Sequence, residues 1–253
     1  MRRVLNGNQD RCMNKDKIST SFKPVFGRVL IVDTDSLACE LLQLRLESDG
    51  FKSEIMADGR RVLDIDLSQY DIILVDLMGC EFNGLKVTRA IKQNPKSVHI
   101  PVIICTSKKT EEDILNGFDA GADDYVVKPF STRELIARIR AVIRRCVRTY
   151  GSRKVHEIVR FKDLTLDVDA GVIAIGEEVV SLTNIEYILL RLLMRNRNSY
   201  FSSAEIRQEA WCGDQSVTDR AIATAFSRLR GKIGEFYGRH IVCRPGIGYG
   251  FIE

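Results

Sequence analysis

The sequence contains no apolar run long enough to cross a membrane. A spanning helix needs about 20 consecutive apolar residues, and no segment of the 253-residue chain approaches this length. Residues 1–22 also lack the apolar centre that a secretory signal peptide requires. We therefore expect an intracellular, cytoplasmic protein with no membrane partner.

The cysteines form no recognisable motif. The chain has seven, an odd number scattered over its whole length, and neither a CxxC pair nor a Cys/His cluster is present. A disulfide framework and a structural zinc site both depend on such spacings. We therefore expect free thiols in a reducing compartment.

Positive charge is unevenly distributed. The net charge is +4, and residues 1–27 hold six basic residues against two acidic ones without hydrophobic periodicity. We expect this segment to be a disordered basic extension. A second cluster, residues 220–244, holds six basic residues and one acid. It favours nucleic-acid binding, because phosphate neutralisation supplies much of such affinity, but a solvated helix face has the same composition.

The chain divides into two domains with different patterns. In residues 28–146, short apolar segments rich in β-branched residues alternate with amphipathic helical segments. This alternation predicts an α/β domain with a doubly wound parallel sheet. In that architecture, ligands bind where the carboxyl ends of the strands meet. The residues at the ends of the four strand-like segments are Asp33, Asp76, Thr106 and Lys128.

The second domain follows a polar linker, which we place at residues 147–155. Residues 156–253 begin with short alternating segments separated by turn signals, which predict antiparallel strands. Three helical segments follow, the first starting after Thr183 with Glu186 completing a capping box. The chain ends in a segment that predicts a hairpin with glycine at its turn.

The four strand ends together predict phosphoryl chemistry. A carboxylate such as Asp76 can accept a phosphoryl group if Mg²⁺ neutralises the oxygens and a lysine covers the remaining charge. Asp33 would then be a metal ligand, Thr106 a hydroxyl that senses the phosphate, and Lys128 the counter-charge. An aspartate at a strand end can also simply cap the next helix.

Residues 28–146 resemble a bacterial response-regulator receiver, a flavodoxin-like domain. The motifs that carry the resemblance are VLIVD ending at Asp33, DIILVDLM around Asp76 with Gly84 eight residues later, PVIICT ending at Thr106, and GADDYVVKPF around Lys128. The resemblance implies that Asp76 is the phosphoacceptor and that Asp33, Asp76 and Met78 hold Mg²⁺. It also implies switch roles for Thr106, Lys128 and Tyr125, and a cis Lys128–Pro129 bond.

The segment after the first strand departs from the family pattern. The family usually has two adjacent acids there, whereas this chain has Asp33 followed by Thr34. Threonine cannot supply the charge of the missing metal ligand, and Mg²⁺ favours carboxylates. Asp35 could substitute, but we expect it to cap the following helix. We therefore expect weakened Mg²⁺ binding and weak or absent phosphorylation of Asp76; the alternative is a conventional, phosphorylation-activated regulator.

The resemblance also implies a homodimer formed through the last helices and strand of the receiver. Salt bridges across a two-fold axis select the partner in this family. The matching residues here are Asp119, Asp124, Glu134, Arg138 and Arg140, whereas an arginine partner of Glu134 is replaced by Ile114. Exposed ion pairs contribute little individually, so ordinary solvated charges are the competing explanation.

The third helix of the second domain has the faces of a DNA-reading helix. Ile222, Phe226, Leu229 and Ile233 form a core stripe. Small polar side chains framed by arginines lie opposite, which suits entry into a major groove. Residues 156–253 resemble the winged helix-turn-helix effector of OmpR/PhoB-type regulators, on the motifs LTNIEYILLRLL, DRAIATAFSRLRGKI and PGIGYGF. The DNA-binding residues that this implies are Arg220, Thr224, Ser227, Arg228, Arg230 and, in the wing, Arg244.

The sequence thus predicts a transcription factor that binds double-stranded DNA and is not an enzyme. RNA polymerase is an expected partner, and whether a sensor histidine kinase acts on the chain stays open. A rival reading is a Mg²⁺-dependent phosphohydrolase, because Asp33-Thr34-Asp35 resembles the DxD nucleophile motif of haloacid-dehalogenase-like enzymes. That reading is disfavoured, because residues 156–253 do not resemble a cap domain.

Overall fold

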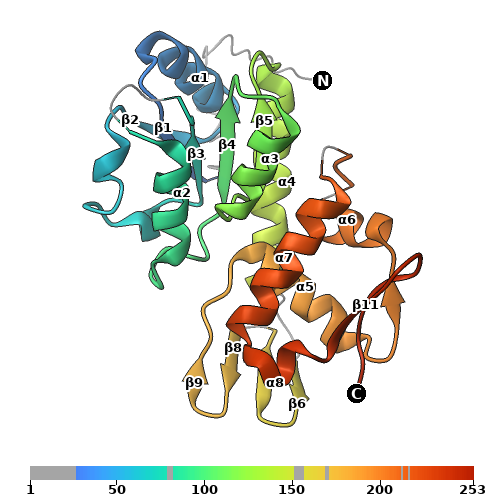
Figure 1. The fold of residues 1–253 in the computed structure, drawn as a ribbon. Coiled ribbons are helices and arrows are strands. Elements are labelled where there is room, and N and C mark those ends of the chain that lie inside the picture. The colour runs from blue at the N-terminus through green and yellow to red at the C-terminus, as the bar shows by residue number, and fades with distance from the viewer. Residues whose placement is uncertain (1–26, 79–81, 151–156, 169–170, 212, 216) are drawn as a thin grey trace, which may run out of the picture.

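The protein folds into two lobes in a computed structural model (Figure 1). The structure describes residues 27–78, 82–150, 157–168, 171–211, 213–215 and 217–253. The predicted disordered extension, apart from Gly27, lies outside the described residues. Within the described residues, no helix combines the length and apolar content that a bilayer crossing requires.

The first lobe contains a parallel five-stranded sheet, which confirms the predicted doubly wound architecture. The strand order is β2-β1-β3-β4-β5, with every neighbouring pair parallel. The three central strands consist almost entirely of apolar residues, as expected where helices cover both faces of a sheet. The strands are β1 (Arg28–Val32), β2 (Lys52–Met56), β3 (Ile72–Val75), β4 (Val102–Thr106) and β5 (Asp124–Val127).

Two helices pack on each face of this sheet. Helices α1 (Ser36–Ser48) and α4 (Thr132–Tyr150) bury Leu46, Leu135 and Ile139 against one face. Helices α2 (Gly84–Gln93) and α3 (Glu111–Asp119) cover the other, with the short 3₁₀ helices η1 (Gly59–Arg61) and η2 (Leu67–Gln69) beside α2. Helix α4 continues to Tyr150, four residues beyond the expected domain boundary at 146.

Strand β2 is absent from the sequence prediction. Its residues, KSEIM, lie at the edge of the sheet, and none of them is fully buried. An edge strand with exposed faces does not need the continuous apolar run that marks β1, β3 and β4. The hydrophobic pattern therefore carried no signal for it.

The second lobe has the predicted order of strands, helices and terminal hairpin. A four-stranded antiparallel sheet contains β6 (Ile158–Phe161), β7 (Leu164–Asp167), β8 (Val172–Ile175) and β9 (Glu178–Val179). The helices are α5 (Asn184–Arg195), α6 (Ser203–Trp211), α7 (Asp219–Lys232) and the short α8 (Gly234–Gly238). A three-stranded sheet of order β10-β12-β11 is formed by β10 (Tyr200–Phe201), β11 (Ile241–Arg244) and β12 (Gly248–Phe251).

Local chemistry explains where these elements start and turn. Thr183 and Glu186 form the predicted capping box at the start of α5, which satisfies two backbone N–H groups. Gly248 has a φ of +138°, and a Cβ atom there would lie 1.9 Å from the Phe201 carbonyl oxygen. Only glycine therefore lets β12 lie so close to β10.

The two lobes pack against each other through a continuous apolar cluster. Phe118 at the end of α3 lies edge-on to Trp211 of α6, with ring centroids 6.3 Å apart. The cluster runs from β4, α3 and β5 into the core around α5, α6 and α7. Figure 1 shows α7 lying beside the first lobe, close to α3.

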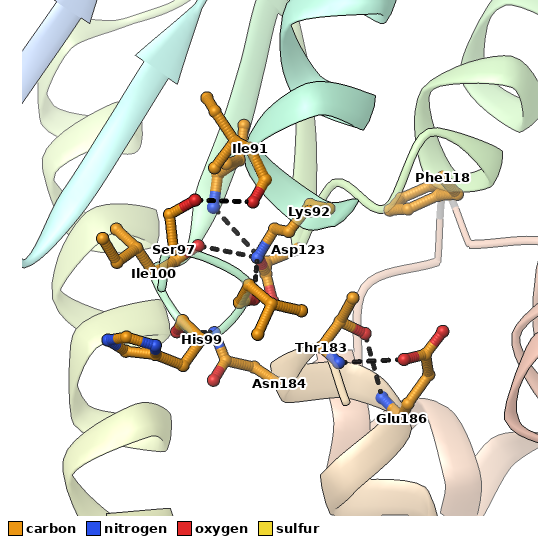
Figure 2. Close-up of polar contacts among 12 residues, drawn as sticks. Ile91, Lys92, Ser97, His99, Ile100, Phe118, Asp123, Thr183, Asn184 and Glu186 are labelled. Atoms are coloured by element: carbon orange, nitrogen blue, oxygen red, sulfur yellow. Dashed lines mark hydrogen bonds and ion pairs between the residues drawn. The ribbon is translucent and has the colours of Figure 1, made fainter. Parts of the chain in front are cut away.

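A buried polar network lies next to this junction (Figure 2). The Lys92 ammonium donates to the Asp123 carboxylate at 2.7 Å and to the Ile100 carbonyl at 2.7 Å, and both charged side chains are almost fully buried. Directly before Ile100 in the sequence, the His99 carbonyl accepts from the Asn184 amide of the second lobe at 2.8 Å. The ion pair therefore orders the segment that the second lobe contacts.

Breaking this ion pair will destabilise the chain. We expect Asp123→Ala to lower the free energy of unfolding by about 3–5 kcal/mol, because the Lys92 ammonium would stay buried without its carboxylate. Asp119→Ala, which removes an exposed carboxylate four residues earlier, should change it by less than about 0.5 kcal/mol. Urea denaturation of both variants tests this, and equal losses would contradict it.

Candidate functional site

The carboxyl ends of the first lobe's strands bring the predicted polar residues together. Lys128, just after β5, donates to Asp33 at 2.7 Å and to Asp76 at 2.8 Å. Burial opposes the charged lysine, but its hydrogen bonds to the two carboxylates outweigh this and raise its pKa. One ammonium thus bridges two carboxylates and leaves one net negative charge.

All four carboxylate oxygens of this pair accept hydrogen bonds. Asp33 accepts from the backbone N–H of Asp35 at 2.9 Å through its Oδ1 atom, and Asp76 accepts from that of Met78 at 3.0 Å. The Oδ2 atoms of both aspartates accept from Lys128. Gly84 is required nearby, because a Cβ atom there would lie 2.2 Å from the Asp76 carbonyl oxygen.

The two residues after Asp33 have different surroundings. Thr34 is half-buried and adds no charge to the site. The Asp35 carboxylate accepts from the Ala38 N–H at 3.0 Å as the N-cap of α1, which confirms the predicted cap. Asp33 and Asp76 are therefore the two carboxylates at this site that could coordinate a cation, because Asp35 already accepts a hydrogen bond at the start of α1.

The predicted switch residues lie in β4, in β5 and directly after β5. Thr106 is fully buried, and its carbonyl accepts from the Lys128 N–H at 2.7 Å. The Tyr125 ring is also buried, its hydroxyl donates to the Lys108 carbonyl at 3.0 Å, and burial raises its pKa. The Lys128–Pro129 bond is cis, as the resemblance implied.

Helix α7 has the predicted core stripe and a solvent face. Ile222, Phe226, Leu229 and Ile233 are each at most 1% exposed. Arg220 and Ser227 are exposed and Thr224 is half-buried, so the polar residues lie off the core. Ala223 and Gly231 are also exposed. This face of α7 therefore presents small side chains and one arginine to solvent.

Arg228 is directed towards the first lobe. Its Nη1 atom donates to the carbonyl of Phe118, and its Nε atom lies 3.6 Å from the Glu186 carboxylate. Glu186 is 1% exposed and also pairs with Lys232 at 2.7 Å. One residue predicted to contact DNA is thus occupied by the other lobe, and Glu186 does more than cap α5.

The remaining arginines predicted to bind DNA differ in their surroundings. Arg230 donates twice to the Ile241 carbonyl, at 3.0 and 2.9 Å, which ties α7 to β11. Arg244 is exposed at the end of β11, with its guanidinium 4.8 Å from the centre of the Tyr200 ring. Arg244 is therefore accessible in the wing with a ring contact only, whereas Arg230 is hydrogen-bonded to β11.

Four of the five residues predicted for the dimer face have ion-pair partners within this one chain. Arg138 contacts Asp124 at 3.3 Å and Glu134 at 3.1 Å. Arg140 pairs with Asp49 at 3.3 Å, not with Asp119, which is exposed. Sequence reasoning missed Asp214, which lies 2.5 Å from Arg138. Asp214 follows α6 in the second lobe, and its position in the sequence carries no motif.

Fold and site together define a two-domain DNA-binding regulator with a receiver. Residues 29–140 match the family described as "Response regulator receiver domain", and residues 176–251 match "Transcriptional regulatory protein, C terminal". A doubly wound sheet with acids at its carboxyl edge and a winged helix-turn-helix are the folds of these two families. The transcription-factor reading from the sequence is thereby confirmed.

Curated relatives share this organisation along almost their whole length. The chain is 35% identical to the response regulator ArlR of Staphylococcus saprophyticus over 88% of this chain and 97% of that protein. It is 36% identical to ArlR of Staphylococcus haemolyticus over 87% and 97%. The chain therefore belongs to the response-regulator family, as a transcriptional regulator of the two-component class. This family consists of DNA-binding regulators and not of phosphohydrolases.

Two solved structures resemble most of the chain. A mutant of RitR aligns with a TM-score of 0.70 at 21% identity, over 88% of this chain and 98% of that one. A second RitR mutant aligns with a TM-score of 0.69 at 23% identity. At these identities the likeness concerns the fold.

The pH dependence of stability should report on Asp124. Burial raises its pKa from 3.8 to about 6, against the lowering effect of Arg138. An acid whose pKa is higher in the folded state favours folding below its unfolded pKa, and this contribution is lost as the pH rises through about 6. Asp124→Asn removes the effect, because asparagine does not titrate.

We therefore expect the unfolding free energy of Asp124→Asn, minus that of the wild type, to rise by about 2 kcal/mol between pH 4.5 and 7.5. Urea titrations at several pH values measure this difference. A difference that stays constant over the range would show that Asp124 keeps its ordinary pKa.

Proposed function

We propose that this regulator binds specific DNA sites as a homodimer and depends weakly or not at all on phosphorylation of Asp76. The observation that supports this best is the charge balance of the acidic site. Asp33 and Asp76 share Lys128, Thr34 is neutral, and Asp35 caps α1. Receiver domains of this family generally bind Mg²⁺ at this place, where the ion neutralises the incoming phosphoryl oxygens.

The residues present fit Mg²⁺ poorly. Mg²⁺ demands near-octahedral oxygen ligands and favours carboxylates. Here the two carboxylates already accept from Lys128 and from backbone N–H groups, and Thr34 adds no third negative ligand. Loss of an outer-shell partner alone costs about 10–100-fold in metal affinity, so a lost carboxylate ligand should cost at least that.

The conventional alternative is phosphorylation-activated control by a sensor histidine kinase. The presence of Thr106, Tyr125 and Lys128 favours it, because these are the switch residues that the resemblance implies and the Lys128 ammonium donates to Asp76 at 2.8 Å. The two alternatives differ in the rate at which Asp76 accepts a phosphoryl group.

Phosphorylation by acetyl phosphate with Mg²⁺ will be slow in the wild type. We expect Thr34→Asp to label at least about tenfold faster, because it supplies the missing carboxylate. Thr34→Asn has a similar size without the charge and should stay slow. Intact mass spectrometry measures the labelling, and rapid stoichiometric labelling of the wild type would refute the proposal.

For DNA binding we propose that α7 lies in a major groove and the wing contacts the adjacent minor groove. Arg220, Thr224 and Ser227 are accessible on α7, and Arg244 is accessible in the wing. Arg228 would join them once it leaves the Phe118 carbonyl. Arg230 would act mainly by holding β11 against α7. RNA polymerase is a proposed partner, and we propose the cytoplasm as the location.

Arg220→Ala should weaken binding to a specific site by about 1–3 kcal/mol if Arg220 reads a base. Arg239→Ala provides the control, since it removes an exposed arginine of the same basic cluster beyond α7. Fluorescence anisotropy with a duplex chosen by in vitro selection measures both. Equal losses for the two variants would indicate general charge attraction in place of sequence reading.

A further inference from the structure

Helix α1 carries leucines on its outer face as well as on the face that packs against the sheet. Leu37, Leu41 and Leu44 are 67%, 60% and 65% exposed, and their spacing of four and three residues places them in one stripe. Leu46, on the opposite side of the helix, is fully buried. A helix on the surface of a soluble domain normally turns polar residues outward. An exposed apolar patch of this kind marks a place where something binds.

This leucine stripe borders a cavity next to the acidic site. The cavity has a volume of about 280 Å³, and most of the residues that line it are apolar. Leu41 and Leu42 of α1 line it together with Phe130, and Asp33 and Lys128 of the acidic site line it as well. A dry cavity of about 150 Å³ is enough to hold a benzene ring. One aromatic side chain therefore fits here.

The segment that precedes β1 joins the receiver close to the end of this helix. The described part of the chain begins at Gly27, whose carbonyl accepts from the Lys52 N–H at 3.0 Å. Lys52 starts β2, four residues after α1 ends at Ser48. Helix α1 is about 20 Å long, whereas residues 17–26 span about 30 Å when extended. This segment is therefore long enough to run along the whole leucine stripe.

Residues 17–26 also match the leucine stripe in chemistry. Their sequence, KISTSFKPVF, holds four large apolar residues and two lysines but no acid. Glu40 and Glu47 are exposed on α1, each three residues after a leucine of the stripe. The segment and the helix face therefore carry opposite charges as well as apolar side chains. The predicted disorder of residues 1–27 agrees with this match, because disordered segments can become ordered when they bind a surface.

We infer that residues 17–26 bind along the leucine stripe of the same chain, with Phe22 in the cavity beside Leu41. The two lysines of the segment then lie towards the glutamates of α1. The covalent link to β1 favours this occupant over a separate protein, because a short tether gives an effective concentration of about the millimolar range. A partner that approaches the acidic site over α1 has to displace the segment. The inference stands apart from the proposed function, because no residue proposed for DNA binding or pairing lies on α1.

Trypsin cleavage of the full-length chain after Lys17 tests this inference, because the protease cuts the segment when it has left the stripe. Leu41→Gln keeps a good helix former but removes the apolar contact, and it should speed cleavage about fivefold. Phe22→Gln should act alike, and the double variant should be no faster than either single one, because all three lack the same contact. Leu63→Gln changes a leucine outside α1 that is 43% exposed, and it should match the wild type. Each rate is divided by that of the free peptide 1–26 of the same sequence.

Carbodiimide coupling, which joins an amine directly to a carboxylate, gives a second readout. Mass spectrometry should find Lys17 or Lys23 joined to Glu40 or Glu47 in the wild type, and Leu41→Gln should lose these links. Wild-type cleavage as fast as that of the free peptide, or equal rates in the wild type and Leu41→Gln, would overturn the inference. Protection that rises with protein concentration would also overturn it, because a second copy would then cover the leucine stripe.

Discussion

Helix α7 packs into the core of the second lobe, contacts the receiver and faces solvent, and the arrangement of the two lobes depends on all three of these environments. Its core stripe, centred on Phe226, packs inside the second lobe. A flank carries Arg228 to the receiver's Phe118 carbonyl, and the solvent face carries Arg220. Because one short helix carries all three, a change in how the lobes pack alters which of its cations are exposed.

At the acidic edge of the receiver, hydrogen-bond donors of the protein itself satisfy the two carboxylates. Lys128 satisfies Asp33 and Asp76 together, and it is tied through its backbone to Thr106 of β4. Thr34 adds no further negative charge, so the Lys128 ammonium and two backbone N–H groups are the partners of all four carboxylate oxygens.

The contacts between the two lobes combine apolar burial with directional polar bonds. The Phe118–Trp211 ring contact buries apolar surface. The hydrogen bond from Asn184 to His99 and the ion pair of Arg138 with Asp214 fix the orientation of the second lobe. The buried Lys92–Asp123 pair stiffens the receiver segment that presents His99. Polar bonds at a junction can be exchanged for equivalent bonds elsewhere, and such exchange lets a junction open without unfolding either lobe.

The sequence by itself determined the two domains, the strand ends that meet at Asp76, the cap at Asp35 and the core stripe of α7. Each of these follows from local periodicity or from the geometry of a parallel sheet. Strand β2 was not predicted from the sequence, because an exposed edge strand needs no continuous apolar run. Only the tertiary structure decided that Arg228 contacts Phe118 and that Asp214 contacts Arg138, residues 76 positions apart. Such pairs depend on how two separately folded surfaces pack, and no local pattern encodes that packing.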